Sequence, residues 1–205
     1  MEARVVNPMR VAAAMFVGAL LLVMTPAAKA GLVGTGAANY CDPYASQAFG
    51  QWGDQSNYVL MPGGSFESGA PSWNLSGGAK IVSGNEPYYL HSTSDRRSLY
   101  MPKGSSASTP TMCFAAGDWH LRFLSVGRQS QLHVSVTVNS LLGVVSILDG
   151  GTVSSNGTWS PSPDISLMLT NVGGLLTTKA VSFRFTAVDG ATQIDDAYLD
   201  PWKDT

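Results

Sequence analysis

Two segments decide the fold predicted for this chain: PGGSFESG at residues 62–69 and QIDDAYLD at residues 193–200. Each segment places a large apolar residue beside carboxylates, and the first also contains glycines that favour tight turns. Trp73 follows the first segment, and the pair Gly77-Gly78 then marks another turn. Short apolar segments punctuated by glycine in this way are typical of an all-β domain.

The residues between these two segments alternate with the period of a β-strand. In residues 131–139 the apolar residues share one face, while His133, Ser135 and Thr137 share the other. Residues 180–188 and 119–123 alternate in the same way, which predicts strands that are buried on one face only.

Further short strands are predicted between turn signals such as Asp149-Gly150-Gly151. They are expected at residues 57–60, 72–75, 79–83, 97–101, 110–114, 143–148 and 193–199. The span 164–176 is ambiguous, because alternation suggests a strand while Leu175-Leu176 suggests a short helix. Many short strands without interleaved helices predict an all-β fold, an antiparallel β-sandwich of the jelly-roll type.

The first 30 residues have the pattern of a helical secretory signal peptide. Arg4 and Arg10 are basic, residues 11–24 are almost purely apolar, and residues 28–30 form a small-x-small cleavage motif. An uncleaved N-terminal anchor is the alternative. We therefore predict a signal peptide at 1–30, a leader segment at 31–48, a β-jelly-roll domain at 49–205 and a secreted, extracellular location.

The composition of the mature chain limits the kinds of partner that it can bind. Removing residues 1–30 deletes three basic residues and one acidic residue, so the formal net charge changes from −2 to −4. A chain without a basic surface is a poor binder of nucleic acid or anionic membranes. Charged residues make up 13% of the sequence, against about 25% in typical soluble proteins. We expect a monomeric secreted domain.

Two cysteines, Cys41 and Cys113, lie outside the predicted signal peptide. An isolated pair in an oxidising compartment usually forms a disulfide. A bridge closing a loop of this length would stabilise the fold by about 4 kcal/mol in the chain-entropy model. The alternative is two unrelated buried thiols, since the spacing fits no zinc motif.

The two terminal segments resemble those of the galactose-binding-domain-like β-jelly rolls, particularly secreted carbohydrate-binding modules. The matching residues are Gly64, Phe66, Glu67, Gly69 and Trp73 in the first segment, and Ile194, Asp195 and Asp196 in the last. Ala197 replaces the valine usual in that family. The mature chain also resembles a group of secreted bacterial proteins, at Phe49, residues 52–54, Tyr58, residues 62–69 and residues 84–87, and this second likeness implies no activity.

The resemblance implies a structural calcium ion (Ca2+) held by Glu67 and Asp195. The residues make such an ion plausible, because alternation places Asp195 on the same face as Ala197 and Leu199, toward the core. A buried carboxylate is costly unless it is paired or bound to a metal, and calcium takes oxygen ligands. The alternative is that Arg184, Arg122 or backbone amides satisfy Asp195.

A glycan ligand is expected where aromatic and polar side chains occur together. Sugar rings stack on aromatic faces, and their hydroxyls bond to planar polar groups. Tyr88, Tyr89 and Trp159 are the predicted aromatic contacts, and Arg122 and His133 are the predicted polar contacts. The alternative is that these aromatic residues only cover a sheet edge.

Catalytic motifs do not stand out in the sequence. It contains no Gly-x-Ser-x-Gly motif, and its three histidines lack metal-site spacing. We therefore predict a non-catalytic module that binds a glycan or cell-surface polysaccharide. The alternatives are a structural or adhesive protein of the cell envelope that binds a protein partner and, third, a glycoside hydrolase using Glu67 with Asp195 or Asp196.

Overall fold

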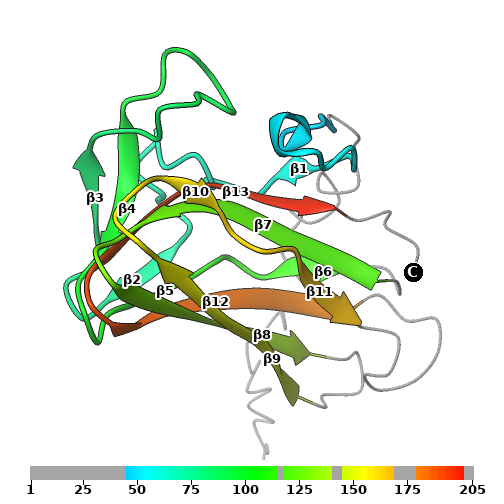
Figure 1. Cartoon of the computed structure of the whole chain (residues 1–205). Helices are drawn as coiled ribbons and strands as arrows, with labels where there is room; N and C mark the ends of the chain where they lie inside the picture. Colours follow the sequence, from blue (N-terminus) through cyan, green and yellow to red (C-terminus); the bar gives the residue numbers. More distant parts are fainter. Residues whose placement is uncertain (1–44, 115–117, 140–144, 169–178, 201–205) are drawn as a thin grey trace, which may run out of the picture. The chain divides into compact units, whose positions relative to one another are not determined.

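The structure is a computed structural model that describes residues 45–114, 118–139, 145–168 and 179–200. Within these residues two antiparallel sheets form two layers (Figure 1). The first sheet has the order β10-β7-β13-β4-β3, with β1 also paired to β13 and β11 to β7. Its strands are β1 (Val59–Leu60), β3 (Lys80–Ser83), β4 (Arg97–Met101), β7 (Asp118–Val126), β10 (Ser160–Pro161), β11 (Ile165–Met168) and β13 (Thr192–Asp200).

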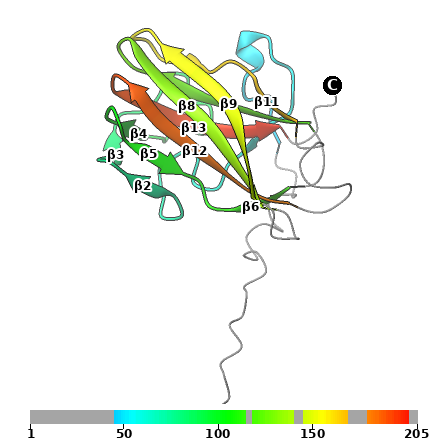
Figure 2. The same ribbon diagram turned by 90° about the horizontal axis from the view of Figure 1, so that it is seen from below.

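The second sheet has the order β2-β5-β12-β8-β9, with β6 also paired to β12 (Figure 2). Its strands are β2 (Asn74–Ser76), β5 (Ser106–Ser108), β6 (Met112–Phe114), β8 (Ser130–Asn139), β9 (Val145–Ser155) and β12 (Lys179–Asp189). A single 3-10 turn, η2 (Gly50–Trp52), is the helical element of the described residues. The predicted all-β antiparallel sandwich is confirmed.

The core between the sheets follows the predicted alternation. The apolar residues on the inward faces of β8 and β12 are buried, whereas His133, Ser135 and Thr137 on the opposite face of β8 are partly exposed. Phe123 of the first sheet meets Phe185 of the second edge to face, with 5.4 Å between ring centroids. Each large apolar side chain buried in this way contributes about 1.5–3 kcal/mol to the stability of the fold.

The two terminal segments identified in the sequence lie side by side. β1 pairs with β13 at Leu60 and Tyr198, and the chain continues along β13 through two backbone hydrogen bonds. Met61 N donates to Ala197 O at 2.8 Å, and Ala197 N donates to Gly64 O at 3.1 Å. A Cβ on Gly64 would lie 2.7 Å from Ala197 O, so only glycine permits this approach.

Residues 62–69 form consecutive turns, in keeping with their glycines. Phe66 points into the core, and its ring contacts Trp73 with 5.0 Å between centroids. Trp73 Nε1 donates to Pro62 O at 2.8 Å. The glycines thus fold this segment into a cap on the core instead of extending it as an edge strand.

A bulge in β13 corrects the predicted orientation of Asp195. The strand register shifts between Asp195 and Tyr198, and Asp196 adopts a left-handed φ of 47°. Ile194 and Ala197 both belong to the core, so the extra residue removes Asp195 from the face of Ala197. Strict alternation misplaced Asp195 for this reason.

Other differences concern strand limits. The predicted turn at Asp149-Gly150-Gly151 is a bulge inside β9, where the register shifts opposite Val134 and Ser135. The ambiguous span contains a strand over 165–168, and two short strands, β5 and β10, were not predicted.

The signal peptide, most of the leader segment and Cys41 lie outside the described residues, as does the side chain of Cys113. The predicted disulfide therefore stays a prediction. The described end of the leader is held by the domain, because Ser46 and Tyr58 exchange two backbone hydrogen bonds. No helix in the described parts of the chain is long and apolar enough to cross a membrane.

Candidate functional site

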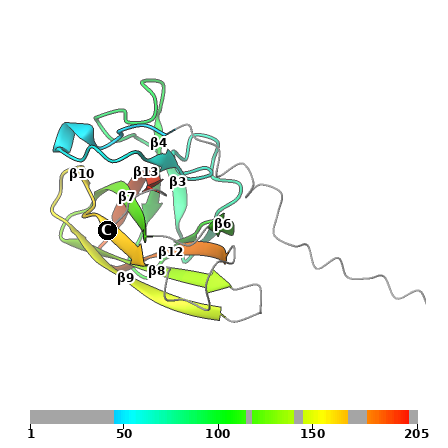
Figure 3. The ribbon, with the colours of Figure 1, turned by 90° about the vertical axis from the view of Figure 1, so that its right-hand side faces the viewer.

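Two segments cover the side of the first sheet that faces away from the second sheet. The first, residues 45–61, contains η2, which lies on the side of β13 away from β8 and β12 (Figure 3), and β1, which pairs with β13 within the sheet. Its Phe49 and Tyr58 pack with Leu124 and Tyr198 of the sheet, and all four side chains are buried. We call these four residues the outer cluster.

An ion pair holds the same segment to the sheet. Arg122 Nη1 donates to Asp54 Oδ2 at 2.7 Å, and the hydroxyl of Tyr58 donates to the same oxygen at 2.7 Å. The guanidinium of Arg122 also lies 4.6 Å from the centroid of the Phe49 ring. Burial alone would raise the pKa of Asp54, but hydrogen bonds from Tyr58 and Arg122 hold it well below its usual range.

The second covering segment, residues 84–96, is organised by the buried carboxylate of Glu86. Its Oε1 accepts a hydrogen bond from Leu90 N at 2.7 Å, and its Oε2 accepts one from Tyr88 N. The same segment is fixed to the bulge of β13, because Glu86 N donates to Asp195 Oδ2 at 3.2 Å. A carboxylate that accepts several amides gives a loop without secondary structure a defined shape.

Tyrosines of this segment form an exposed aromatic surface. Tyr88 and Tyr89 are 40% and 44% exposed, unusually high for large aromatic residues. Tyr88 meets Trp52 edge to face with 4.8 Å between centroids, and its hydroxyl donates to Trp159 O at 3.0 Å. Trp52 and Trp159 are partly buried against the outer cluster. We call Trp52, Tyr88, Tyr89 and Trp159 the aromatic surface.

The structure brings together some of the predicted ligand residues. Tyr88 and Trp159 are in contact, and Tyr89 is adjacent in sequence. Arg122 forms an ion pair with Asp54, and its guanidinium lies over the Phe49 ring. His133 lies on the second sheet, where it contacts Asp149 at 3.0 Å. None of these placements tests whether the residues bind a ligand.

Trp52 is the member of the aromatic surface that the sequence analysis did not select as a ligand residue. Its 3-10 turn ends at Gly53, which has φ of 85°. The Trp-Gly-Asp sequence at residues 52–54 was the available signal, because a large aromatic residue at a glycine turn outside the alternating strands has no predicted core position.

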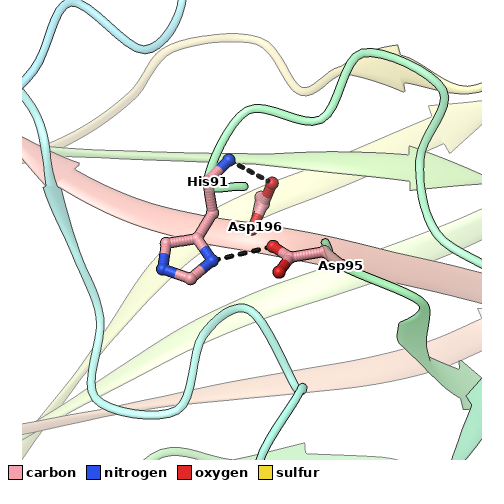
Figure 4. Close-up of side chains that lie close together, drawn as sticks. All are labelled: His91, Asp95 and Asp196. Carbon is pink, nitrogen blue, oxygen red and sulfur yellow. Dashed lines mark hydrogen bonds and ion pairs between the residues drawn. The ribbon is translucent and has the colours of Figure 1, made fainter. Parts of the chain in front are cut away.

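Four carboxylates and one histidine gather where residues 84–96 meet the bulge of β13. We call them the acidic cluster. Glu86, Asp195 and Asp196 are fully buried, Asp95 is almost so, and His91 is partly exposed. His91 Nδ1 lies 2.7 Å from Asp95 Oδ2 (Figure 4). Within the described parts of the chain, no lysine or arginine forms an ion pair with Glu86, Asp195 or Asp196.

The electrostatics of this acidic cluster follow from that burial. Burial, followed by the neighbouring charge of Asp196, raises the pKa of Asp195 to about 9. Burial, followed by the charge of Glu86, raises the pKa of Asp196 to about 7. Without a cation, the cluster therefore favours retaining a proton at neutral pH.

The predicted calcium ligands have other partners in the structure. Glu67 Oε1 accepts hydrogen bonds from Arg96 N at 2.7 Å and Arg97 N at 2.6 Å. Asp195 accepts from Asp196 N through Oδ1 and from Glu86 N through Oδ2. Backbone amides thus satisfy Asp195, which was the alternative considered from the sequence. Calcium binding by Glu67 and Asp195 stays a prediction.

Comparison with known proteins gives structural neighbours only. No family model and no curated protein matches the sequence. The structure is similar to that of TmCBM61 in complex with β-1,4-galactotriose, with a TM-score of 0.45 and 19% identity over 70% of this chain and 98% of that one. It is also similar to the CBM22-2 xylan-binding domain from Paenibacillus barcinonensis Xyn10C, with a TM-score of 0.47 and 10% identity over 68% of this chain and 98% of that one.

A third similar structure contains the CBM22-1 and GH10 modules of Clostridium thermocellum endo-1,4-β-D-xylanase 10B, complexed with xylohexaose. Its TM-score is 0.49 and its identity 10%, over 71% of this chain and 28% of that one. Carbohydrate-binding modules thus occur among the structures similar to this chain.

Proposed function

We propose that this domain is a secreted, non-catalytic module that binds a glycan through the aromatic surface. The observation that carries the proposal is that the exposed Tyr88 contacts both Trp52 and Trp159, with a second exposed tyrosine, Tyr89, next to it in the chain. The apolar faces of sugar rings stack on such side chains, and phenol hydroxyls and indole groups supply hydrogen bonds.

The contacts of the aromatic surface support binding with little loss of conformational entropy. The Tyr88 ring is held by Trp52 and by the carbonyl of Trp159, and the backbone beneath it is held by Glu86. Tyr89 lies under the guanidinium of Arg96, at 6.0 Å from the ring centroid. Side chains that are already fixed lose less freedom when a ligand binds.

Isothermal titration of the mature chain with xylan and β-1,4-galactan oligosaccharides, after a glycan array, tests the proposal. We expect Tyr88→Ala and Tyr89→Ala each to weaken binding by about tenfold, since an aromatic stacking contact contributes on the order of 1 kcal/mol. The matched control is Ile147→Ala on β9, because Ile147 is a 73% exposed apolar residue of the second sheet. Its affinity should equal that of the parent chain.

Two outcomes would overturn the proposal. One is the absence of binding to every glycan on the array. The other is binding that survives both tyrosine substitutions unchanged. Capture of a protein partner that also survives an excess of free sugar would favour the alternative adhesive role. Sequencing of the secreted chain tests export, with residue 31 expected as the new N-terminus.

A further inference from the structure

We infer that His91, Asp95 and Asp196 form a binding site for a divalent transition-metal ion, separate from the predicted calcium ligands Glu67 and Asp195. The site is composed of one imidazole and two carboxylates. It lies where residues 84–96 cross the bulge of β13 (Figure 4). The inference goes beyond glycan binding and does not depend on it.

The geometry of the three side chains suits one small ion. One ligand atom from each residue lies within 4.8 Å of the other two. Ligand atoms bound tetrahedrally at about 2.1 Å from a zinc ion lie about 3.4 Å apart. A contraction of at most about 1.4 Å at the widest separation therefore completes the site, and the exposed His91 ring has the freedom to provide it.

An unsatisfied oxygen provides a second, independent indication of a ligand. Asp196 is fully buried, and its Oδ2 accepts a hydrogen bond from His91 N at 3.2 Å. Its Oδ1 is buried without any hydrogen-bond partner. A buried carboxylate oxygen without a partner is costly in free energy, and a bound cation would remove that cost.

The charge of the surroundings also favours a divalent cation. The site lies against two further buried carboxylates, Glu86 and Asp195, and among the described residues no lysine or arginine forms an ion pair with either one. Buried like charges without a cation repel one another strongly, because the local dielectric constant is low. A divalent ion at His91, Asp95 and Asp196 offsets that repulsion.

The histidine decides the class of ion. Calcium and magnesium prefer sites made only of oxygen. Imidazole nitrogen combined with carboxylate oxygen suits zinc, manganese and other first-row transition metals. The metal would take the place of the proton now shared by His91 Nδ1 and Asp95 Oδ2, and that proton would leave to solvent. The exposed edge of His91 gives the ion an entry path and leaves coordination positions for water.

The test uses the mature chain dialysed against a chelator and then titrated with ZnCl2, MnCl2 or CaCl2 alone. We expect saturable zinc or manganese binding at one site, and a rise in Tm of about 5–10 °C at a metal concentration a hundredfold above Kd. Calcium should not occupy this site, so any Tm shift with CaCl2 should be the same in His91→Ala as in the parent chain. X-ray absorption at the zinc edge should show one imidazole nitrogen in the first coordination shell.

Substitutions locate the ion. Loss of a residue that only orients a ligand weakens metal affinity by about 10–100-fold, so His91→Ala should weaken zinc affinity by at least about 100-fold. Asp196→Asn, which keeps the shape of the side chain, should act similarly. His133→Ala is the matched control, because His133 forms the same kind of pair with Asp149 on the second sheet, 3.0 Å apart.

Three results would overturn the inference: no Tm shift with zinc or manganese, full zinc affinity in His91→Ala, or equal loss in His133→Ala. Because no sugar is used, failure here leaves the proposed glycan binding untouched, and the reverse also holds.

Discussion

The outward faces of the two sheets differ in what lies on them. On the second sheet, His133, Ser135 and Thr137 are partly exposed, and Ile147 is largely exposed. On the first sheet, residues 45–61 and 84–96 cover the corresponding face and bury aromatic residues and carboxylates against it. The same alternation thus gives a solvated face in one sheet and a second buried layer in the other. The candidate sites lie where that second layer is present.

The largest expected loss of stability comes from removing an aromatic side chain of the outer cluster. Phe49 is fully buried against Tyr58 and Tyr198, with ring centroids 5.0 and 5.8 Å away. Phe49→Ala should lower the free energy of unfolding by about 4 kcal/mol, because it leaves a cavity among aromatic rings. Urea unfolding measures the loss.

The control for that experiment is Ile147→Ala on the exposed face of β9. Its effect should stay within about 0.5 kcal/mol. Equal losses at Phe49 and Ile147 would show that the covering layer adds no more stability than the solvated face.

The next largest loss of stability is expected from breaking the ion pair between Asp54 and Arg122. Asp54→Asn leaves the mostly buried guanidinium of Arg122 without its counter-charge and should cost about 3 kcal/mol. The pKa of Asp54 is lowered by folding. Its contribution is therefore complete above the ordinary value of 3.8, and it declines as the pH falls below that value toward the folded-state pKa.

Chemical denaturation at several pH values between 7 and 2 tests this assignment. The parent chain should lose stability below about pH 4 more steeply than Asp54→Asn, because the variant lacks that titrating group. Parallel curves for the two proteins would contradict the assignment.

A smaller effect is expected at Glu67, whose Oε1 accepts the amides of Arg96 and Arg97. Because Glu67 is partly exposed, Glu67→Ala should cost about 1–2 kcal/mol. Glu67→Gln, which keeps an acceptor oxygen, should cost less. If Glu67 and Asp195 bind calcium, a chelator should lower the Tm of the parent chain and CaCl2 alone should restore it.

Glu67→Ala should then lose that calcium response. If neither chelator nor CaCl2 changes the Tm of either protein, the calcium prediction is wrong. The substitution would still report on the amide contacts through its loss of stability.

The smallest effect is expected on the solvated face. His133 forms an exposed ion pair with Asp149, and such pairs contribute on the order of 0–1 kcal/mol. His133→Ala should change the urea midpoint within error and leave glycan binding intact. A clear loss of glycan affinity would move the ligand site to the second sheet, as the sequence analysis allowed.

Several elements could be predicted from the sequence because their signals are local. Alternation over 131–139 and 180–188 identified two central strands and their buried faces. Glycines at 63 and 64 marked the turn that caps the core. The bulge at Asp195 and Asp196 could not be predicted, because an inserted residue changes pairing between strands without leaving a distinct pattern within one strand.

The candidate sites were predicted only in part. Tyr88, Tyr89 and Trp159 were selected as aromatic residues near turns, and the structure places Tyr88 against Trp159. Trp52 was not selected, because its contact with Tyr88 joins segments distant in sequence. Glu86 was not selected as a site residue, whereas its carboxylate holds the backbone of residues 84–96.

The sequence alone determined the class of fold, the two faces of β8 and β12 and the turns at residues 62–69, since each depends on neighbouring residues. Tertiary structure alone decided which outward face would be covered and which carboxylates would gather beneath the cover. Burial and pairing of charges depend on segments that meet in space, such as residues 84–96 and β13. The contacts that stabilise these arrangements join residues far apart in the chain, so no periodic pattern in the sequence marks them.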